Sequence, residues 1–123
     1  MSKRIIVVDD HEDNRQILRV LLASAGYTMI EAPDGETALA AALSEQPDLI
    51  LMDIQLPGLD GYEVTRRIKS NPGFHDVPII AVTSYALSGD EQKALAAGCI
   101  AYVAKPYSPM QLLAKIQQYL ASG

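Results

Sequence analysis

The sequence predicts an α/β domain built on a doubly wound, five-stranded parallel sheet. Short apolar runs typical of buried strands alternate with segments of helical periodicity, and no low-complexity linker interrupts them. Strict alternation of this kind indicates a parallel sheet whose right-handed crossover helices cover both faces. The second apolar run also contains Thr28 and Glu31, which is typical of an edge strand. The strand order 2-1-3-4-5 places that strand at an edge.

The first half of the predicted fold follows from periodicity and capping. Residues 5–8 form the first strand. Four apolar residues at helical spacing indicate the helix that follows: Ile17, Leu18, Leu21 and Leu22. Gly26 stands where a helix commonly ends, and residues 27–31 form the second strand. Asp34 caps a second helix that runs to Leu43.

The second half of the fold is predicted in the same way. The third strand, the third helix and the fourth strand lie at residues 49–52, 62–69 and 77–82. Two capping boxes begin the last two helices: Ser88 with Glu91, and Ser108 with Gln111, which has Pro109 at the first helical position. Gly98 ends the fourth helix, residues 100–104 form the fifth strand, and the last helix extends to Leu120.

Composition narrows the class of protein. The chain has 123 residues, of which 49% are hydrophobic, and a net charge of −5 that disfavours binding to nucleic acid or to anionic lipid. Its apolar runs are far shorter than the ~20 residues that span a bilayer, and Met1–Arg4 leads into a strand rather than a signal peptide. Cys99, the only cysteine, can form neither an intrachain disulfide nor a thiolate metal site. We expect a single domain over residues 1–123 in the cytoplasm.

Polar residues stand at the carboxyl ends of four predicted strands: Asp9 and Asp10, Asp53, Thr83 and Ser84, and Lys105 followed by Pro106. In the order 2-1-3-4-5 the switch point lies between strands 1 and 3, and ligands bind there at the carboxyl ends. Three carboxylates this close repel one another, and the single charge of Lys105 does not balance them. Because the ligands are all oxygens, the expected divalent cation is Mg²⁺.

A partly hydrated Mg²⁺ can also hold a phosphoryl oxygen, which makes Asp53 the expected nucleophile and an acyl phosphate the expected product. Lys105 and the Thr83 hydroxyl would bind other phosphoryl oxygens. A flavodoxin-like cofactor domain has the same (βα)5 architecture, but the acidic loop at residues 9–13 repels a phosphate. A haloacid-type phosphatase has a second acid two residues after its nucleophile, where this chain has Gln55.

This set of strand-end residues on five β/α repeats resembles the receiver domain of two-component response regulators, the CheY-like superfamily. The stretch ILMDIQLPGLDGYEV is most similar to free-standing receivers of the DivK type, and receivers of hybrid histidine kinases share much of it. The resemblance implies that Asp53 is the phosphoacceptor. It implies that Mg²⁺ is bound by Asp9, Asp10, Asp53 and the backbone carbonyl of Gln55.

The resemblance also implies how such a domain signals. Thr83 and Lys105 sense the phosphoryl group, Tyr102 changes rotamer with phosphorylation, and Lys105–Pro106 is a cis peptide. Gln55 and Tyr85 occupy variable positions that influence the phosphoryl lifetime. A histidine kinase or histidine phosphotransferase protein is the implied donor, and a target protein is expected on the face formed by the fourth helix, fifth strand and fifth helix.

Such a domain catalyses its own phosphorylation and slow dephosphorylation, so we do not expect an enzyme of external substrates. Two alternatives remain: a receiver excised from a larger hybrid kinase or multidomain regulator, and, less favoured, a phosphatase. No output domain is expected within residues 1–123.

Simpler roles compete for several residues. Asp9 or Asp10 could cap the first helix, and Tyr102 could be ordinary sheet packing. Charged residues on two helices are expected to be solvated: Arg15 and Arg19 on the first, and Arg66, Arg67 and Lys69 on the third. His11 is expected to be an exposed loop residue.

Overall fold

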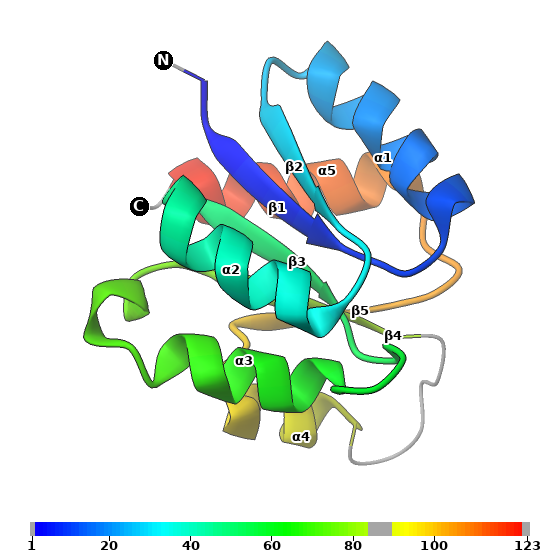
Figure 1. The fold of residues 1–123 in the computed structure, drawn as a ribbon. Coiled ribbons are helices and arrows are strands. Elements are labelled where there is room, and N and C mark those ends of the chain that lie inside the picture. Colours follow the sequence, from blue (N-terminus) through cyan, green and yellow to red (C-terminus); the bar gives the residue numbers. More distant parts are fainter. Residues whose placement is uncertain (1, 84–89, 122–123) are drawn as a thin grey trace.

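Strands and helices alternate along the chain in the computed structural model, which describes residues 2–83 and 90–121 (Figure 1). The elements within these residues are β1 (Arg4–Val8), α1 (Glu12–Ser24), β2 (Thr28–Ala32), α2 (Gly35–Glu45), β3 (Leu49–Asp53), α3 (Gly61–Lys69), the short 3₁₀ helix η1 (Pro72–Phe74), β4 (Ile79–Thr83), α4 (Asp90–Ala97), β5 (Ala101–Ala104) and α5 (Pro109–Ala121). The predicted strands and helices are confirmed, with boundaries that shift by one or a few residues.

The strands form one parallel sheet in the order β2-β1-β3-β4-β5, as predicted. The register pairs Val8 of β1 with Met52 of β3, and Thr83 of β4 with Ala104 of β5. The carboxyl ends of β1, β3, β4 and β5 therefore lie at one edge of the sheet, which is where the polar strand-end residues stand.

Helices cover both faces of the sheet, α1 and α5 on one and α2, α3 and α4 on the other (Figure 1). Alternate residues of β1 enter two separate cores. Ile5 packs with Leu22 and Ile116 from the α1 and α5 side, whereas Ile6 packs with Val64 from the α2 to α4 side. The central strands β3 and β4 are buried along their whole length, as expected for a sheet covered on both faces.

Several helix ends have the predicted caps. The Asp34 side chain accepts a hydrogen bond from the Thr37 backbone N–H at 2.7 Å, and Gly26 and Gly98 follow α1 and α4 with φ of +87° and +115°. Pro109 is the first residue of α5. The predicted capping box that begins at Ser88 lies outside the described residues.

Two apolar residues that helped to indicate the first two helices lie on the surface. Ile17 is 53% exposed and Leu43 is 64% exposed. In α1 the buried residues Leu18 and Leu22 are one turn apart, so Ile17 lies about 100° around the helix from the buried stripe. Apolar spacing alone therefore predicts a wider buried face than α1 has. Within the described residues, no helix combines the length and the apolar character needed to cross a bilayer.

Candidate active site

The acidic residues predicted at the strand ends come together at the carboxyl edge of the sheet. Asp9 and Asp53 are buried, with exposed fractions of 4% and 2%, whereas Asp10 and His11 are exposed. These four residues each offer one ligand atom, and the four atoms lie within 4.8 Å of one another. The adjacency of β1 and β3 produces this cluster, since it places two chain segments more than 40 residues apart in sequence side by side.

The backbone beside Asp53 is held by a close approach of α3. The Gly61 N–H donates to the Ile54 carbonyl at 3.1 Å. A Cβ at Gly61 would lie 2.7 Å from Ile54 Cα and would collide with the Asp53 carbonyl oxygen. Only glycine fits there, so the Asp60–Gly61 turn allows α3 to begin against the residue that carries the central carboxylate.

Lys105 joins the two buried carboxylates. Its Nζ lies 3.2 Å from Asp9 Oδ2 and 3.2 Å from Asp53 Oδ2. The Lys105 backbone N–H donates to the Thr83 carbonyl at 2.6 Å, and the Lys105–Pro106 peptide is cis, as the resemblance implied. Burial lowers the pKa of Lys105, but the charges of Asp53 and Asp9 outweigh it and raise the pKa above its ordinary value. The ammonium is therefore charged at neutral pH.

The carboxylate oxygens also accept backbone hydrogen bonds. Asp53 Oδ1 accepts from the Gln55 N–H at 2.9 Å, and Asp9 Oδ1 accepts from the His11 N–H at 2.8 Å. Burial is the largest influence on Asp53, and despite Lys105 and the Gln55 N–H the pKa of its carboxyl is raised above the ordinary value. The surroundings of Asp53 thus disfavour the charged form of its carboxyl.

The alternative role of Asp9 and Asp10 as side-chain caps of α1 is not what the structure shows. The N-cap of α1 is His11, which makes no side-chain capping hydrogen bond. The Asp9 side chain instead accepts a hydrogen bond from the backbone N–H of the N-cap residue, His11. The Asp10 Oδ1 atom lies 3.1 Å from His11 Nδ1.

The predicted signalling residues lie along β4 and β5. Thr83 is buried at the end of β4, and its Oγ1 accepts a hydrogen bond from Gln55 Nε2 at 2.6 Å. Tyr102 is partly buried on β5 and packs against the core on the α2 to α4 side. Ser84 and Tyr85 lie outside the described residues.

The donor set fits a magnesium ion. Ligands on opposite sides of an octahedral Mg²⁺ are ~4.2 Å apart, so atoms within 4.8 Å of one another need only a small adjustment to bind the ion. Asp9, Asp10 and Asp53 supply carboxylate oxygens, which Mg²⁺ prefers, and the exposure of Asp10 leaves one side open to water.

Three residues near the cluster were not assigned to it from the sequence. Asn14 Nδ2 donates to Asp9 Oδ2 at 3.3 Å, and Arg15 donates to the Asp9 carbonyl oxygen at 2.5 Å. His11 lies beside both acids, although it is exposed as expected. The sequence carries one indication that Asn14 and Arg15 lie near the cluster. Both stand in the first turns of the helix that begins just after the acids.

The expectation that the charged residues of α1 and α3 are simply solvated is wrong for two of them. Arg15 is largely buried among Glu12, Glu31 and the Asp9 carbonyl. Lys69 donates to the backbone carbonyls of residues 74, 75 and 77. Long side chains can bury their stems while their charges find local acceptors, which helical spacing alone does not reveal.

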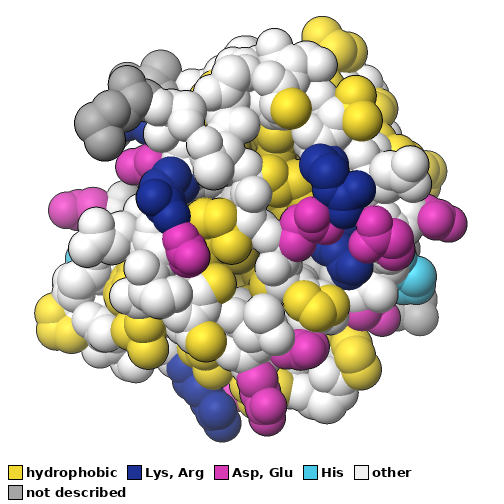
Figure 2. Space-filling model, turned by 45° about the horizontal axis from the view of Figure 1, so that its top comes forward, with side chains coloured by type: hydrophobic (Ala, Val, Ile, Leu, Met, Phe, Trp, Pro, Cys, Tyr) yellow, Lys and Arg dark blue, Asp and Glu magenta, His cyan; other side chains and the backbone are white. Residues whose placement is uncertain are grey.

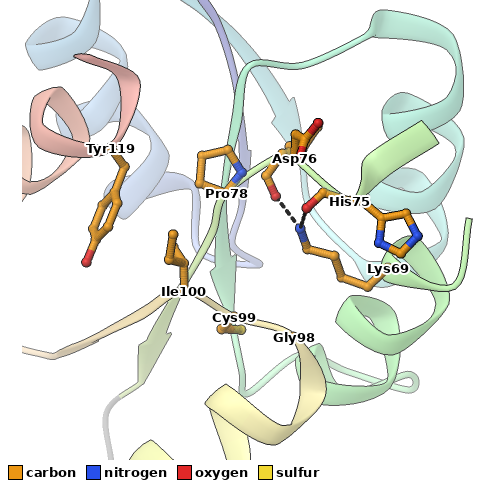
Figure 3. A pocket seen from close by; sticks show the side chains of 9 residues that line it. Lys69, His75, Asp76, Pro78, Gly98, Cys99, Ile100 and Tyr119 are labelled. Carbon is orange, nitrogen blue, oxygen red and sulfur yellow. Dashed lines mark hydrogen bonds between the residues drawn. The ribbon is translucent and has the colours of Figure 1, made fainter. Parts of the chain in front are cut away.

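A pocket of about 600 Å³ lies at the end of the sheet opposite the acidic cluster. It is enclosed by α3, α5 and the residues that lead into β4 and β5. Figure 3 shows the Lys69 ammonium turned toward backbone carbonyls, with Cys99, Ile100 and Tyr119 around the pocket. Because the acceptors of Lys69 are part of the chain itself, this lysine serves as a structural clamp rather than as part of the acidic site.

The surface carries charges of both signs. Figure 2 shows basic side chains beside acidic ones, with hydrophobic side chains between these clusters, and no extended basic patch on the face in view. A groove beside Lys105 is lined by Asn14, Ile17, Pro106, Tyr107 and Pro109, so an exposed apolar surface adjoins the acidic cluster.

Comparison with known proteins identifies the family. Residues 5–117 match the model of the response regulator receiver domain. The chain therefore belongs to this family, the receiver domains of two-component signalling systems, whose partners in general are histidine kinases or phosphotransfer proteins.

The chain is similar over its full length to polar-differentiation response regulator DivK of Brucella ovis, with 42% identity over 123 residues that cover 100% of both proteins. Among solved structures, it resembles the receiver domain of sensor histidine kinase PA1611 from Pseudomonas aeruginosa, with a TM-score of 0.90, 37% identity and coverage of 98% and 99% of the two chains. That receiver holds a magnesium ion in its active site cleft. Chemotaxis protein CheY4 of Vibrio cholerae matches with a TM-score of 0.91, 28% identity and coverage of 97% and 99%.

Proposed function

We propose that this receiver accepts a phosphoryl group on Asp53 from a phosphohistidine and releases it slowly to water. The observation that carries the proposal is the arrangement of three carboxylates and one lysine around a buried strand end. Asp53 lies within hydrogen-bonding distance of Lys105, and its ligand oxygen lies within 4.8 Å of those of Asp9 and Asp10.

Asp9, Asp10, Asp53 and the backbone carbonyl of Gln55 would hold Mg²⁺, in keeping with the magnesium ion described for the PA1611 receiver. When bound, the ion would offset the acidic charge and withdraw electron density from the phosphoryl oxygens. Asp9 is kept in place by its bonds to the His11 N–H and to Asn14, so its carboxylate is oriented before any ion arrives.

In the transfer step, one carboxylate oxygen of Asp53 attacks phosphorus. An O–P bond forms while the P–N bond to the donor imidazole breaks, and the imidazole leaves with the bonding electron pair. Lys105 then pairs with a phosphoryl oxygen, and Thr83 donates its hydroxyl hydrogen to another. Gln55 Nε2 donates to Thr83 Oγ1 at 2.6 Å, so the side chain two residues after Asp53 contacts the hydroxyl that would bind the phosphoryl group.

Release reverses the chemistry with water in place of imidazole. Water attacks phosphorus, and the Asp53 carboxylate leaves. A haloacid-type phosphatase would protonate its leaving group with an acid two residues after the nucleophile, whereas here Gln55 occupies that position and its side chain donates a hydrogen bond to Thr83. We therefore assign a signalling role, in which Gln55 and Tyr85 influence the lifetime of the phosphoryl group.

Output would pass through the α4–β5–α5 face. Movement of Thr83 toward the phosphoryl group would change the space available to Tyr102, which lies on the neighbouring strand. Leu95 and Ile100 are 49% and 48% exposed on or beside α4 and β5, and they give a target protein an apolar contact surface. We propose that residues 1–123 act as a single receiver domain in the cytoplasm, where a donor phosphorylated from ATP would meet it.

The test is intact-mass measurement after incubation with Mg²⁺ and a small acyl phosphate. We expect a labile mass gain of one phosphoryl group. The gain should be absent from Asp53→Asn and from a sample treated with a chelator. A stable gain, or a gain that persists in Asp53→Asn, would overturn the assignment of Asp53.

A further inference from the structure

We propose that Arg15 is a positioning residue of the magnesium site, which it serves by fixing the peptide that joins Asp9 to Asp10. The inference rests on the function proposed above, because it concerns the same acidic cluster. The role of Arg15 differs from the roles of Asp9, Asp10 and Asp53, because Arg15 would contact neither the metal nor the phosphoryl group. It would act through the Asp9 backbone.

The Arg15 guanidinium has three separate acceptors. Nη1 donates to the Asp9 carbonyl at 2.5 Å, Nη2 to Glu12 Oε2 at 2.6 Å, and Nε to Glu31 Oε1 at 3.1 Å. Only 13% of the side chain is exposed. The guanidinium is planar and largely buried, and its three acceptors fix it in one orientation. In this orientation Nη1 is directed at the residue that follows β1.

The Asp9 carbonyl belongs to the same peptide unit as the Asp10 N–H, so a bond to this oxygen restrains the direction in which Asp10 leaves β1. The peptide on the other side of Asp9 is also held, because the Asp9 N–H donates to the Ala32 carbonyl at 3.1 Å. Both peptide planes around Asp9 are thereby fixed. This restraint sends the Asp9 carboxylate inward and leaves the Asp10 carboxylate at the open side of the cluster.

Arg19 provides a matched control in the same ion-pair cluster. It donates to Glu12 at 3.0 Å and to Glu31 at 2.6 and 2.9 Å, one helical turn after Arg15. Within the described residues its hydrogen bonds go to these two glutamates, whereas Arg15 also reaches the Asp9 carbonyl. The two arginines thus share charge and acidic partners and differ in the contact to the metal site.

The two possible roles of Arg15 predict changes of opposite sign. If Arg15 acts only as a nearby positive charge, its removal should tighten Mg²⁺ binding, since less positive charge opposes the ion. If it positions the Asp9–Asp10 peptide, its removal should weaken binding. Loss of such an outer contact typically costs 10–100-fold in metal affinity, so we expect the Kd to rise by about tenfold or more.

The experiment compares wild type, Arg15→Gln and Arg19→Gln by calorimetric Mg²⁺ titration, and by the NMR resonance of the Asp9 carbonyl carbon without metal. We expect Arg15→Gln to raise the Kd and to shift this resonance in the metal-free protein. Arg19→Gln should do neither. If Arg15→Gln does not fold, Arg15→Lys tests the same point, because one ammonium cannot reproduce the three-way fork.

An unshifted Asp9 carbonyl resonance together with an unchanged or lower Kd in the Arg15 variant would overturn the positioning role while leaving the magnesium site intact. Equal losses in the Arg15 and Arg19 variants would also overturn it, since they would point to general loss of the ion-pair cluster. If wild type itself binds no Mg²⁺, the proposed site fails, and the positioning role fails with it.

Discussion

The surroundings of Asp53 disfavour the charged form of its carboxyl. The side chain is 3% exposed, and burial raises the pKa of the carboxyl even though Lys105 and the Gln55 N–H oppose the shift. When it is ionised, a buried carboxylate that is contacted by one ammonium is a stronger nucleophile than one in water, because it has few water molecules around it. The same burial costs folding stability.

This cost predicts the effect of Asp53→Asn. Because the native pKa is raised, folding disfavours the ionised form, and stability is lost as pH rises from the ordinary carboxyl value through the native one. Asparagine mimics the protonated acid, so metal-free Asp53→Asn should be more stable than wild type at pH 7. The difference should shrink as the pH falls below the ordinary carboxyl value. Urea denaturation at several pH values in the presence of a chelator measures it.

Asp34 is the control of opposite sign. The backbone N–H of Thr37 lowers the pKa of the Asp34 carboxyl, so its ionised form stabilises the folded state. Asp34→Asn should therefore lose stability at pH 7, and this loss should disappear as the pH falls through the lowered pKa. If both variants changed stability in the same direction at pH 7, burial would not be what governs Asp53.

Among the elements, the junction between β3 and α3 sets the position of Asp53. Gly61→Ala would push a Cβ against the Asp53 carbonyl and Ile54 Cα, which are backbone atoms that cannot move aside cheaply. We expect a loss of ~1–3 kcal/mol in unfolding free energy, together with slower phosphorylation, because α3 and the strand end must separate. Chemical denaturation and the rate of phosphoryl gain test the two effects.

Gly73→Ala serves as the matched control. A Cβ at Gly73 would meet its nearest neighbour, Asn71 Oδ1, at an ordinary 3.5 Å, far from the acidic cluster. We expect little change in stability and none in phosphorylation rate. Equal effects of the two substitutions would show that loss of glycine flexibility, rather than the close approach beside Asp53, is responsible.

The elements also show what could and could not be predicted from the sequence. The alternation of strands and helices predicts a parallel sheet, and the polar residues of the second strand favour the order 2-1-3-4-5. That order brings Asp9, Asp53 and Lys105 to one edge. Contacts made by long side chains were not predictable in this way. The Gln55–Thr83 bond and the Arg15 contact to the Asp9 carbonyl depend on side-chain rotamers and on how α1 lies beside β2.

At the scale of the whole molecule, binding of Mg²⁺ should couple to folding. The ion would bind a cluster that exists only when β1 and β3 are paired, so we expect it to raise the melting temperature. At a hundredfold excess over Kd the linkage contributes ~2.7 kcal/mol. Thermal denaturation with and without Mg²⁺ measures this gain.

Asp10→Asn tests whether carboxylate repulsion is the source of the coupling. The substitution removes one negative charge from the cluster, so the metal-free protein should melt at a higher temperature, and most of the Mg²⁺ response should be lost. If Asp10→Asn melted earlier without metal and kept the full Mg²⁺ shift, Asp10 would not belong to the metal site.

The central claim is that the phosphoryl group is carried by Asp53, and the most direct measurement locates it. After phosphorylation in the presence of Mg²⁺, borohydride reduces an aspartyl phosphate to homoserine, and peptide mapping then identifies the altered residue. We predict homoserine at position 53 and at no other acid. Homoserine at position 9 or 10 with an unaltered Asp53 would contradict the account, since an acid that follows β1, and not Asp53 at the end of β3, would then be the nucleophile.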